Sequence, residues 1–201
     1  VGLTMDKESL SKYAKRMKLI SVTRESDGVL SVTANDLLGA ELATRHLVQL
    51  GHKKIAFLAN PQTDGYRDRL SGYENAMIKA GLERLVMESS YLRSEAESDA
   101  GELLDSVKPT AVFAHNDLAA LGVLDALVAR NLKPGKDVAV VGYDNTSLSE
   151  APVLALTTVN PHSQDLGRQA AKLALALLAD PSAKLSSVVL TPELVIRASA
   201  S

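Results

Sequence analysis

Short apolar runs alternate with longer amphipathic stretches along nearly the whole chain. The short runs, rich in β-branched and aliphatic residues, predict strands, and the stretches with helical periodicity predict helices. The predicted strands cover 1–5, 19–23, 29–33, 54–59, 86–91, 110–114, 137–143, 155–159 and 187–196. The predicted helices cover 7–17, 36–50, 68–81, 95–107, 117–130 and 161–179. This alternation is typical of βαβ units, so the sequence predicts an α/β fold with parallel sheets.

Several predicted helix ends carry local signals. Ser94 with Glu97 has the spacing of a capping box, which predicts that a helix opens there. Asn160 followed by Pro161 predicts an N-cap with proline at the first helical position. Gly51 and Gly81 directly follow predicted helices. A helix often ends in a residue with left-handed backbone conformation, which glycine adopts at the lowest energetic cost.

Composition limits the class of protein. The chain has 201 residues, of which 46% are hydrophobic and 23% charged, as in an ordinary globular protein. The net charge of −2 argues against this chain itself binding nucleic acid, and no apolar stretch approaches the length of a membrane span. Cysteine is absent, which excludes disulfides and thiolate chemistry and fits a reducing compartment. The chain opens as if inside a buried strand, so we expect an N-terminal part of the natural protein to precede Val1.

Common catalytic motifs are absent. The chain has no G-x-G-x-x-G, no Walker A sequence, no H-E-x-x-H and no G-x-S-x-G. Its four histidines, His46, His52, His115 and His162, show no metal-ligand spacing. The sequence therefore predicts a protein that is not an enzyme and that uses neither a cofactor nor a metal.

Polar and aromatic side chains follow several predicted strands where those strands end. These residues are Tyr91, Asn116, Asp117, Tyr143, Asp144 and Asn145, joined by Arg69 at the start of a predicted helix. Ligands of open parallel sheets bind beyond the carboxyl ends of the strands. Carboxylates and amides accept and donate to adjacent hydroxyls, arginine bridges two oxygens, and an aromatic ring covers the apolar face of a sugar. The set therefore favours a site for a polyol.

Each of these residues also has a purely structural interpretation. Asn116 or Asp117 can cap the helix that follows, and Arg69 can pair with a carboxylate. Tyr91 can be core packing, and Asp144 can form an Asx-turn. The pattern of residues alone leaves both interpretations open.

The chain resembles a known family at these residues. The stretches "RLSGYENAMIKAGL", "AVFAHNDLAALG", "VAVVGYDN", "LTTVNPHSQDLGRQAAKLALALL" and "TPELVIRASAS" resemble the lactose/galactose-repressor (LacI/GalR) family of bacterial transcription regulators, in order and over essentially the whole chain. This resemblance implies a two-lobe, periplasmic-binding-protein-like core with doubly wound parallel sheets that binds a small effector between its lobes. It also implies that the DNA-binding helix-turn-helix is absent from this chain.

The resemblance divides the chain into lobes. It implies a partial N-terminal lobe of residues 1–34 and 160–182, and a C-terminal lobe of residues 35–155 and 186–201. The chain is then expected to cross between lobes near residues 34–35, 156–160 and 181–186.

Carried over by position, the family's motifs imply roles for individual residues. Arg69 and Asp144 are expected to hydrogen-bond the effector, with Asn116 the next candidate. Tyr91 is expected to stack on it, and Asp117 resembles a helix-start carboxylate with a structural role. Asn145, next to Asp144, completes the expected ligand-binding set, while His115 stays unassigned. The chain departs from the family's pattern at Thr23, Ala34 and Asn160-Pro161-His162, which bears on the effector class.

The resemblance implies a cytoplasmic, homodimeric regulator with no membrane association, which senses a sugar-like effector and binds operator DNA through a helix-turn-helix. A periplasmic sugar-binding protein of a transporter is the alternative, and the C-terminal P-E-L-V-I-R-x-S argues against it. An enzyme on a doubly wound sheet is a third hypothesis, disfavoured by the missing motifs.

Overall fold

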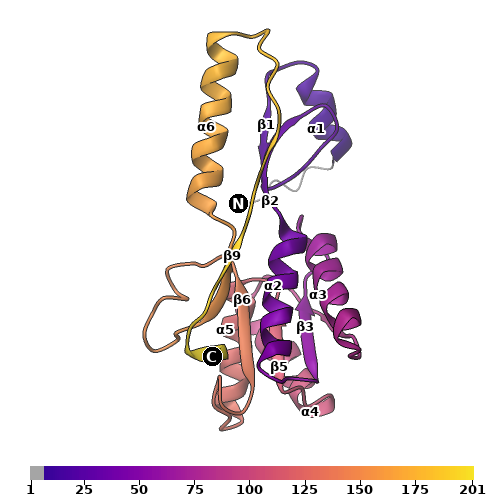
Figure 1. Cartoon of the computed structure of the whole chain (residues 1–201), viewed down its shortest axis with the longest axis vertical. Helices are drawn as coiled ribbons and strands as arrows, with labels where there is room; N and C mark the ends of the chain where they lie inside the picture. The colour runs from indigo at the N-terminus through magenta and orange to yellow at the C-terminus, as the bar shows by residue number, and fades with distance from the viewer. Residues whose placement is uncertain (1–6) are drawn as a thin grey trace. The chain divides into compact units, whose positions relative to one another are not determined.

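The computed structural model describes residues 7–201, so the predicted strand 1–5 lies outside the described residues. The chain forms two compact units. Unit 1 consists of Val1–Asn35 and His162–Thr191, and unit 2 of Asp36–Pro161 and Pro192–Ser201 (Figure 1). The residues predicted to bind a ligand all belong to unit 2.

Unit 1 is built on a three-stranded parallel sheet. Its strands are β1 (Ile20–Val22), β2 (Leu30–Ala34) and β8 (Val188–Leu190), in the order β1-β2-β8. The helices of this unit are α1 (Lys7–Ala14) and α6 (Ser163–Ala179). Helix α6 packs against β1 and β2 and buries Leu166 and Leu177.

Unit 2 is built on a six-stranded sheet of order β4-β3-β5-β6-β7-β9. The strands are β3 (Ile55–Ala59), β4 (Leu85–Glu88), β5 (Ala111–Ala114), β6 (Ala139–Tyr143), β7 (Thr157–Asn160) and β9 (Glu193–Val195). All neighbours pair in parallel except β7 and β9, which pair antiparallel. The short 3-10 helix η1 (Ala198–Ala200) ends the unit.

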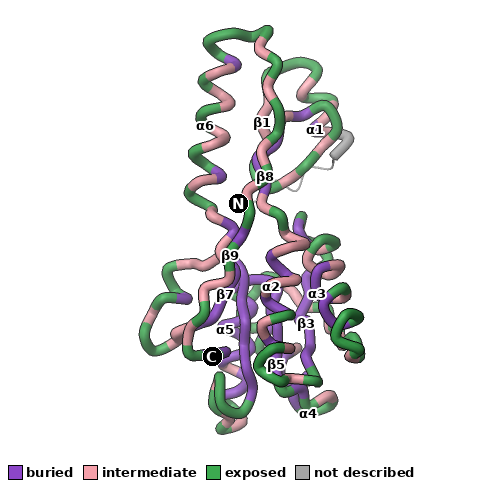
Figure 2. The backbone as a smooth tube through the Cα atoms, viewed as in Figure 1, coloured by how far each residue is buried: buried purple, intermediate pink, exposed green. Residues whose placement is uncertain are grey.

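Helices cover both faces of this sheet. Helices α2 (Asp36–Gln49) and α3 (Tyr66–Ala80) pack on one face, and α4 (Arg93–Ser106) and α5 (Asp117–Ala129) pack on the other. Ile55, Phe57 and Ala59 of β3 point to the first face, while Ala56 and Leu58 point to the second. In a strand covered by helices on both faces, successive side chains are all buried and mostly apolar. This explains why the central strands of unit 2 are continuous apolar stretches in the sequence and not alternations of apolar and polar residues (Figure 2).

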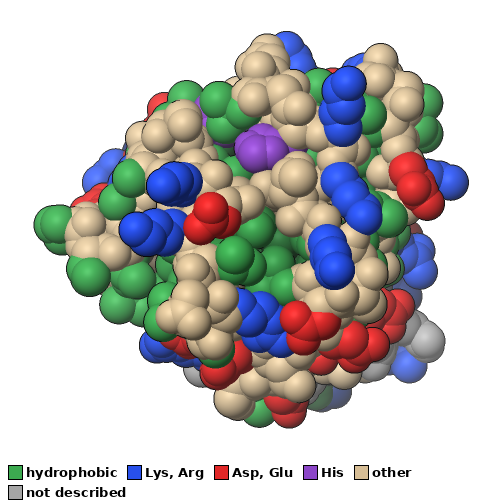
Figure 3. Space-filling model, turned by 90° about the horizontal axis from the view of Figure 1, so that it is seen from below, with side chains coloured by type: hydrophobic (Ala, Val, Ile, Leu, Met, Phe, Trp, Pro, Cys, Tyr) green, Lys and Arg blue, Asp and Glu red, His purple; other side chains and the backbone are tan. Residues whose placement is uncertain are grey.

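The surface of the molecule mixes charges of both signs. The face drawn in Figure 3 carries basic and acidic side chains interspersed with hydrophobic ones, in keeping with the net charge of −2. No described helix is long and apolar enough to cross a membrane.

The structure confirms the α/β class and the predicted helices, but corrects some boundaries. The stretch 187–196 is two strands, β8 and β9, one in each sheet, separated around Pro192, whose nitrogen has no hydrogen to donate. The predicted capping box is wrong, because α4 begins at Arg93 with Leu92 as its N-cap. The predicted Asn160 cap is also wrong, because Asn160 ends β7 and α6 begins after His162. Gly81 does adopt the expected left-handed cap, with φ of 66°.

Gly72 lets α2 and α3 approach closely, so its replacement tests this packing. A Cβ on Gly72 would overlap the backbone carbonyl oxygen of Leu37, which cannot rotate away. We expect Gly72→Ala to lower the free energy of unfolding by about 1–3 kcal/mol, measured by urea denaturation. Gly167→Ala on α6 is the matched control, because a Cβ there meets nothing within 4 Å and alanine favours helix by about 0.5–1 kcal/mol. Equal effects of the two substitutions would contradict this account.

Candidate functional site

The carboxyl ends of the parallel strands in unit 2 carry a cluster of polar side chains. Strand β3 is followed by Asn60, β5 by His115, Asn116 and Asp117, and β6 by Asp144 and Asn145. Arg69 reaches this edge from the start of α3 and Tyr91 from the segment after β4. The structure therefore brings the predicted site residues to one edge of one sheet.

Arg69 is held from three sides. Its Nε donates to Asp36 Oδ1 at 3.1 Å, its Nη1 donates to the carbonyl oxygen of His115, and its guanidinium lies 3.6 Å from the ring centroid of Tyr143. The side chain is only 13% exposed. A Cβ on Gly65 would overlap the Asp36 carboxylate, so this glycine leaves room for the ion pair. The partner of Arg69 is thus the first residue of α2, distant in sequence, and its remaining N–H groups stay available.

Asp144 and Asn145 form a sharp corner after β6. Both have positive φ, 107° and 48°, and the Asp144 N–H donates to the carbonyl of Val159 at 2.8 Å. Burial raises the pKa of Asp144 to about 7, helped by the charges of Asp117 and Asp36 and opposed by that of Arg69. Within residues 7–201 its carboxyl group accepts no hydrogen bond. A carboxyl group with free acceptors at a strand end is suited to bind ligand hydroxyls.

Asp117 anchors the segment that follows Asn145. It is buried, and it accepts hydrogen bonds from the Thr146 N–H at 2.7 Å, the Thr146 hydroxyl at 2.8 Å and the Thr158 hydroxyl at 2.5 Å. Thr158 Oγ1 in turn accepts from the Asn145 N–H at 3.3 Å. Burial raises the pKa of Asp117, while these hydrogen bonds oppose that shift. All of these contacts are to residues that form the corner after β6 or the neighbouring strand β7.

Asn116 caps helix α5. Its Oδ1 accepts a hydrogen bond from the Ala119 N–H at 2.7 Å, and the side chain is buried. The oxygen is therefore committed to the helix, and only the amide NH₂ group remains to meet a ligand. The cap and the ligand contact, which the sequence left as alternatives, can coexist in this residue.

Arg197 supports the same corner from the segment after β9. Its Nη1 donates to the carbonyl of Leu156 at 2.8 Å and to the Ser149 hydroxyl at 3.2 Å, and its Nη2 donates to Asn145 Oδ1 at 2.9 Å. Sequence reasoning missed this role. The only signal was the arginine of the C-terminal P-E-L-V-I-R-x-S stretch, which lies 52 residues from Asn145.

His115 lies under Tyr91. The two rings meet edge to face with centroids 5.9 Å apart, and Tyr91 is 50% exposed whereas His115 is buried. Burial lowers the pKa of His115 to about 4, assisted by the positive charge of Arg69, so the imidazole is neutral at pH 7. The exposed Tyr91 ring thus lies beside the buried His115 at the carboxyl edge of the sheet.

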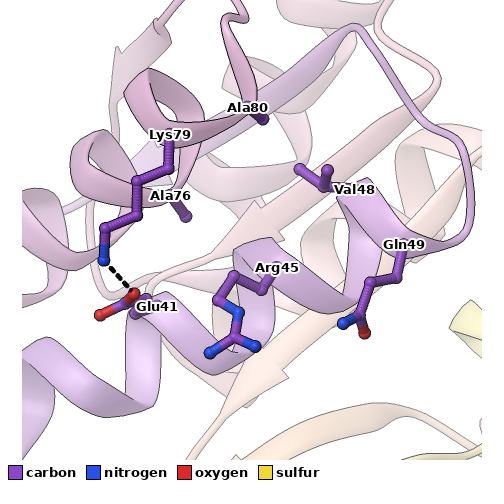
Figure 4. Close-up of a pocket in the computed structure, with 7 residues that line it drawn as sticks. All are labelled: Glu41, Arg45, Val48, Gln49, Ala76, Lys79 and Ala80. Carbon is purple, nitrogen blue, oxygen red and sulfur yellow. Dashed lines mark hydrogen bonds and ion pairs between the residues drawn. The ribbon is translucent and has the colours of Figure 1, made fainter.

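A surface groove lies apart from this cluster. This groove of about 290 Å³ between α2 and α3 is lined by Glu41, Arg45, Val48, Gln49, Ala76, Lys79 and Ala80 (Figure 4). Lys79 and Glu41 pair across it at 2.7 Å, and none of the predicted site residues lines it.

Among the residues that the structure describes, no group of three or more His, Cys, Asp or Glu side chains could hold a metal ion.

Comparison with known proteins identifies relatives over most of the chain. Residues 44–200 match the family of periplasmic binding protein-like domains. The transcriptional regulator DegA of Bacillus subtilis is 34% identical over 85% of this chain and 52% of its own length. The ribose operon repressor of Escherichia coli is 35% identical over 83% of this chain and 52% of its own length. The chain thus spans about half the length of the curated relatives it matches.

Solved structures agree with these relatives. A LacI transcriptional regulator from a Rhodococcus species superposes with a TM-score of 0.92 and 34% identity, over 98% of this chain and 74% of that one. A LacI family regulator from Enterococcus faecium with bound ribose has a TM-score of 0.90 and 26% identity, over 97% and 75%. These relatives are named as transcriptional regulators, in agreement with the prediction that the chain is not an enzyme. The chain therefore belongs to the periplasmic binding protein-like domain family and, within it, to the LacI family of transcriptional regulators.

Proposed function

We propose that the polar edge of unit 2 binds a small sugar-like effector, and that this binding changes operator affinity through a helix-turn-helix outside this chain. The observation that carries the proposal is the pairing of Arg69, whose remaining N–H groups are donors, with Asp144, whose carboxyl group is an unused acceptor. Together they can bind adjacent hydroxyls of one ring. The relatives support this ligand class, since one is a ribose operon repressor and one structure holds ribose.

The other predicted residues complete the site. Tyr91 stacks on the ring of the effector, the Asn116 amide donates to it, and Asn145 holds the corner that presents Asp144. Asp117 acts through the backbone that it anchors. We assign unit 1 to the partial N-terminal lobe and unit 2 to the C-terminal lobe.

We further propose that the protein is a cytoplasmic homodimer. Leu148 and Val153, in the segment that Asp117 and Arg197 anchor, are 51% and 90% exposed, and Leu118 next to Asp117 is 41% exposed. Exposed apolar side chains of this size favour a protein contact. The segment that follows Asp144 then connects the effector site with the partner subunit. Through it, effector binding can be coupled to the arrangement of the dimer, with a coupling free energy of about 1–3 kcal/mol.

A ligand screen on the full-length protein tests the function. Sugars and nucleosides are added in a thermal-shift assay, where a ligand at about 100 times its Kd adds about 2.7 kcal/mol of stability. We expect at least one sugar to stabilise the protein and to change its operator affinity. The proposed function is wrong if no sugar or nucleoside does either.

Arg69→Lys then tests the site. Lysine keeps a positive charge beside Asp36 but loses the planar fork, so we expect effector affinity to fall about 30-fold or more with only a small change in Tm. Arg84→Lys is the control, because Arg84 forms an exposed ion pair with Glu74 and directly precedes β4, at the amino end of that strand. Unchanged effector affinity in Arg69→Lys contradicts the assignment.

A further inference from the structure

The charges of the side chains at the polar edge of unit 2 sum to zero or to a negative value. The guanidiniums of Arg69 and Arg197 lie among four carboxylates, those of Asp36, Asp117, Asp144 and Glu150. His115 adds no positive charge at neutral pH. An incoming anion therefore meets more negative than positive charge, in surroundings where partial burial strengthens repulsion.

Both guanidiniums are already held by groups of the protein. Arg69 is bound to Asp36 and to the His115 carbonyl and lies on the Tyr143 ring. Arg197 is divided among Leu156, Ser149 and Asn145, with Glu150 at 3.7 Å. Bidentate binding of a phosphate or carboxylate requires two parallel N–H groups of one fork. Arg197 would have to leave its present partners to supply them, whereas the free N–H groups of Arg69 belong to a guanidinium whose charge is already paired with Asp36.

His115 adds a hydrogen-bond acceptor to this edge. Its Nδ1 lies 3.3 Å from the carbonyl oxygen of Leu58, which can only accept, so Nδ1 carries the proton. In the neutral ring Nε2 then has a lone pair, and this buried atom has no hydrogen-bond partner among residues 7–201. A hydroxyl or N–H can donate to it, whereas an ionised phosphate or carboxylate cannot. The half-exposed Tyr91 ring contacts the His115 ring edge to face at the same edge of the sheet.

A buried donor is unused at the neighbouring strand end. Asn60 follows β3, which pairs with β5, and its Oδ1 accepts from the Gln62 N–H at 3.0 Å. This fixes the amide orientation and leaves Nδ2 as a donor without a partner among the described residues. Hydroxyl groups both donate and accept, so a polyol can satisfy Nε2 of His115 and Nδ2 of Asn60, while an anion can satisfy only the latter.

We propose that this edge selects uncharged polyols over their phosphorylated or carboxylated derivatives, and that His115 determines part of that selectivity by accepting a ligand hydroxyl. The inference rests on the proposed function and narrows its ligand class. It excludes sugar phosphates and sugar acids as the effector.

Matched pairs of ligands test the selectivity on the full-length protein. Calorimetry at pH 7.5 compares ribose with ribose 5-phosphate, glucose with glucose 6-phosphate and gluconate, and adenosine with its 5′-monophosphate. We expect at least one uncharged member to bind, and each charged derivative to bind at least tenfold more weakly than its parent. A charged derivative that binds as tightly as its parent overturns the inference but leaves the proposed function standing. Binding of no member of the panel overturns both.

His115→Phe tests the histidine itself. Phenylalanine keeps a ring against Tyr91 but removes the acceptor, so affinity for the uncharged ligand is expected to fall about tenfold while Tm stays the same or rises. His52→Phe is the control, because His52 lies before β3, at the opposite end of the strand, and bonds Thr110. Wild-type affinity in His115→Phe would overturn the role of His115. A parallel loss of affinity for charged and uncharged ligands would overturn its part in selectivity.

Discussion

Asp144→Asn is expected to stabilise the protein at pH 8 and to weaken effector binding about a hundredfold. Burial raises the pKa of Asp144 to about 7, so the folded state holds a proton that the unfolded state releases near pH 4. The stability that this proton gives is complete below about pH 4 and is lost as the pH rises through 7. Asparagine carries no charge to desolvate. We therefore expect a gain of about 1–2 kcal/mol at pH 8, reduced from the full shift because the group is partly exposed.

Unfolding by urea at pH 5 and pH 8 checks this expectation. The advantage of Asp144→Asn should appear at pH 8 and largely disappear at pH 5. The loss of affinity has a separate cause, because an amide replaces a carboxylate that accepts from two hydroxyls. Glu102→Gln, at an exposed position of α4, serves as the control. An advantage that is equal at both pH values would contradict the link to titration.

Asp117→Ala is expected to lower the free energy of unfolding by about 3 kcal/mol. The substitution removes three hydrogen bonds and leaves the buried Thr158 hydroxyl and the Thr146 N–H without their acceptor. A Cβ on Gly142 would overlap the Asp117 carboxylate, so the space is shaped for that group and stays empty in the variant. Asp117→Asn keeps an acceptor oxygen and should lose about half as much.

Two measurements separate this effect from general destabilisation. Urea denaturation gives the free energy, and hydrogen exchange at the Thr146 amide reports the local anchor. Asp125→Ala is the control, because the exposed ion pair with Arg93 is worth at most about 1 kcal/mol. If Asp117→Ala costs no more than this control, the anchoring role of Asp117 is wrong.

The sequence predicted the order of helices and strands well because both periodicities are local. Strands β3, β5 and β6 are buried at every residue and are therefore continuous runs of mainly apolar residues, which stand out in the sequence. The sequence predicted the first residues of the helices less accurately. The Ser94 box and the Asn160 cap each had the right residues, but α4 begins one residue before Ser94 and β7 extends to Asn160. Packing of a whole helix or pairing of a whole strand outweighs one capping bond.

The sequence by itself determined the α/β class and which polar residues gather at the carboxyl edge of the sheet in unit 2. It could do so because parallel strands all end at the same edge. Only the tertiary structure decided the partners of those residues. Asp36 is 33 residues from Arg69, and Arg197 is 52 residues from Asn145. A hydrogen bond acts over about 3 Å in space and leaves no periodic trace along the chain, so these pairings arise only when the folded sheet brings its strand ends together.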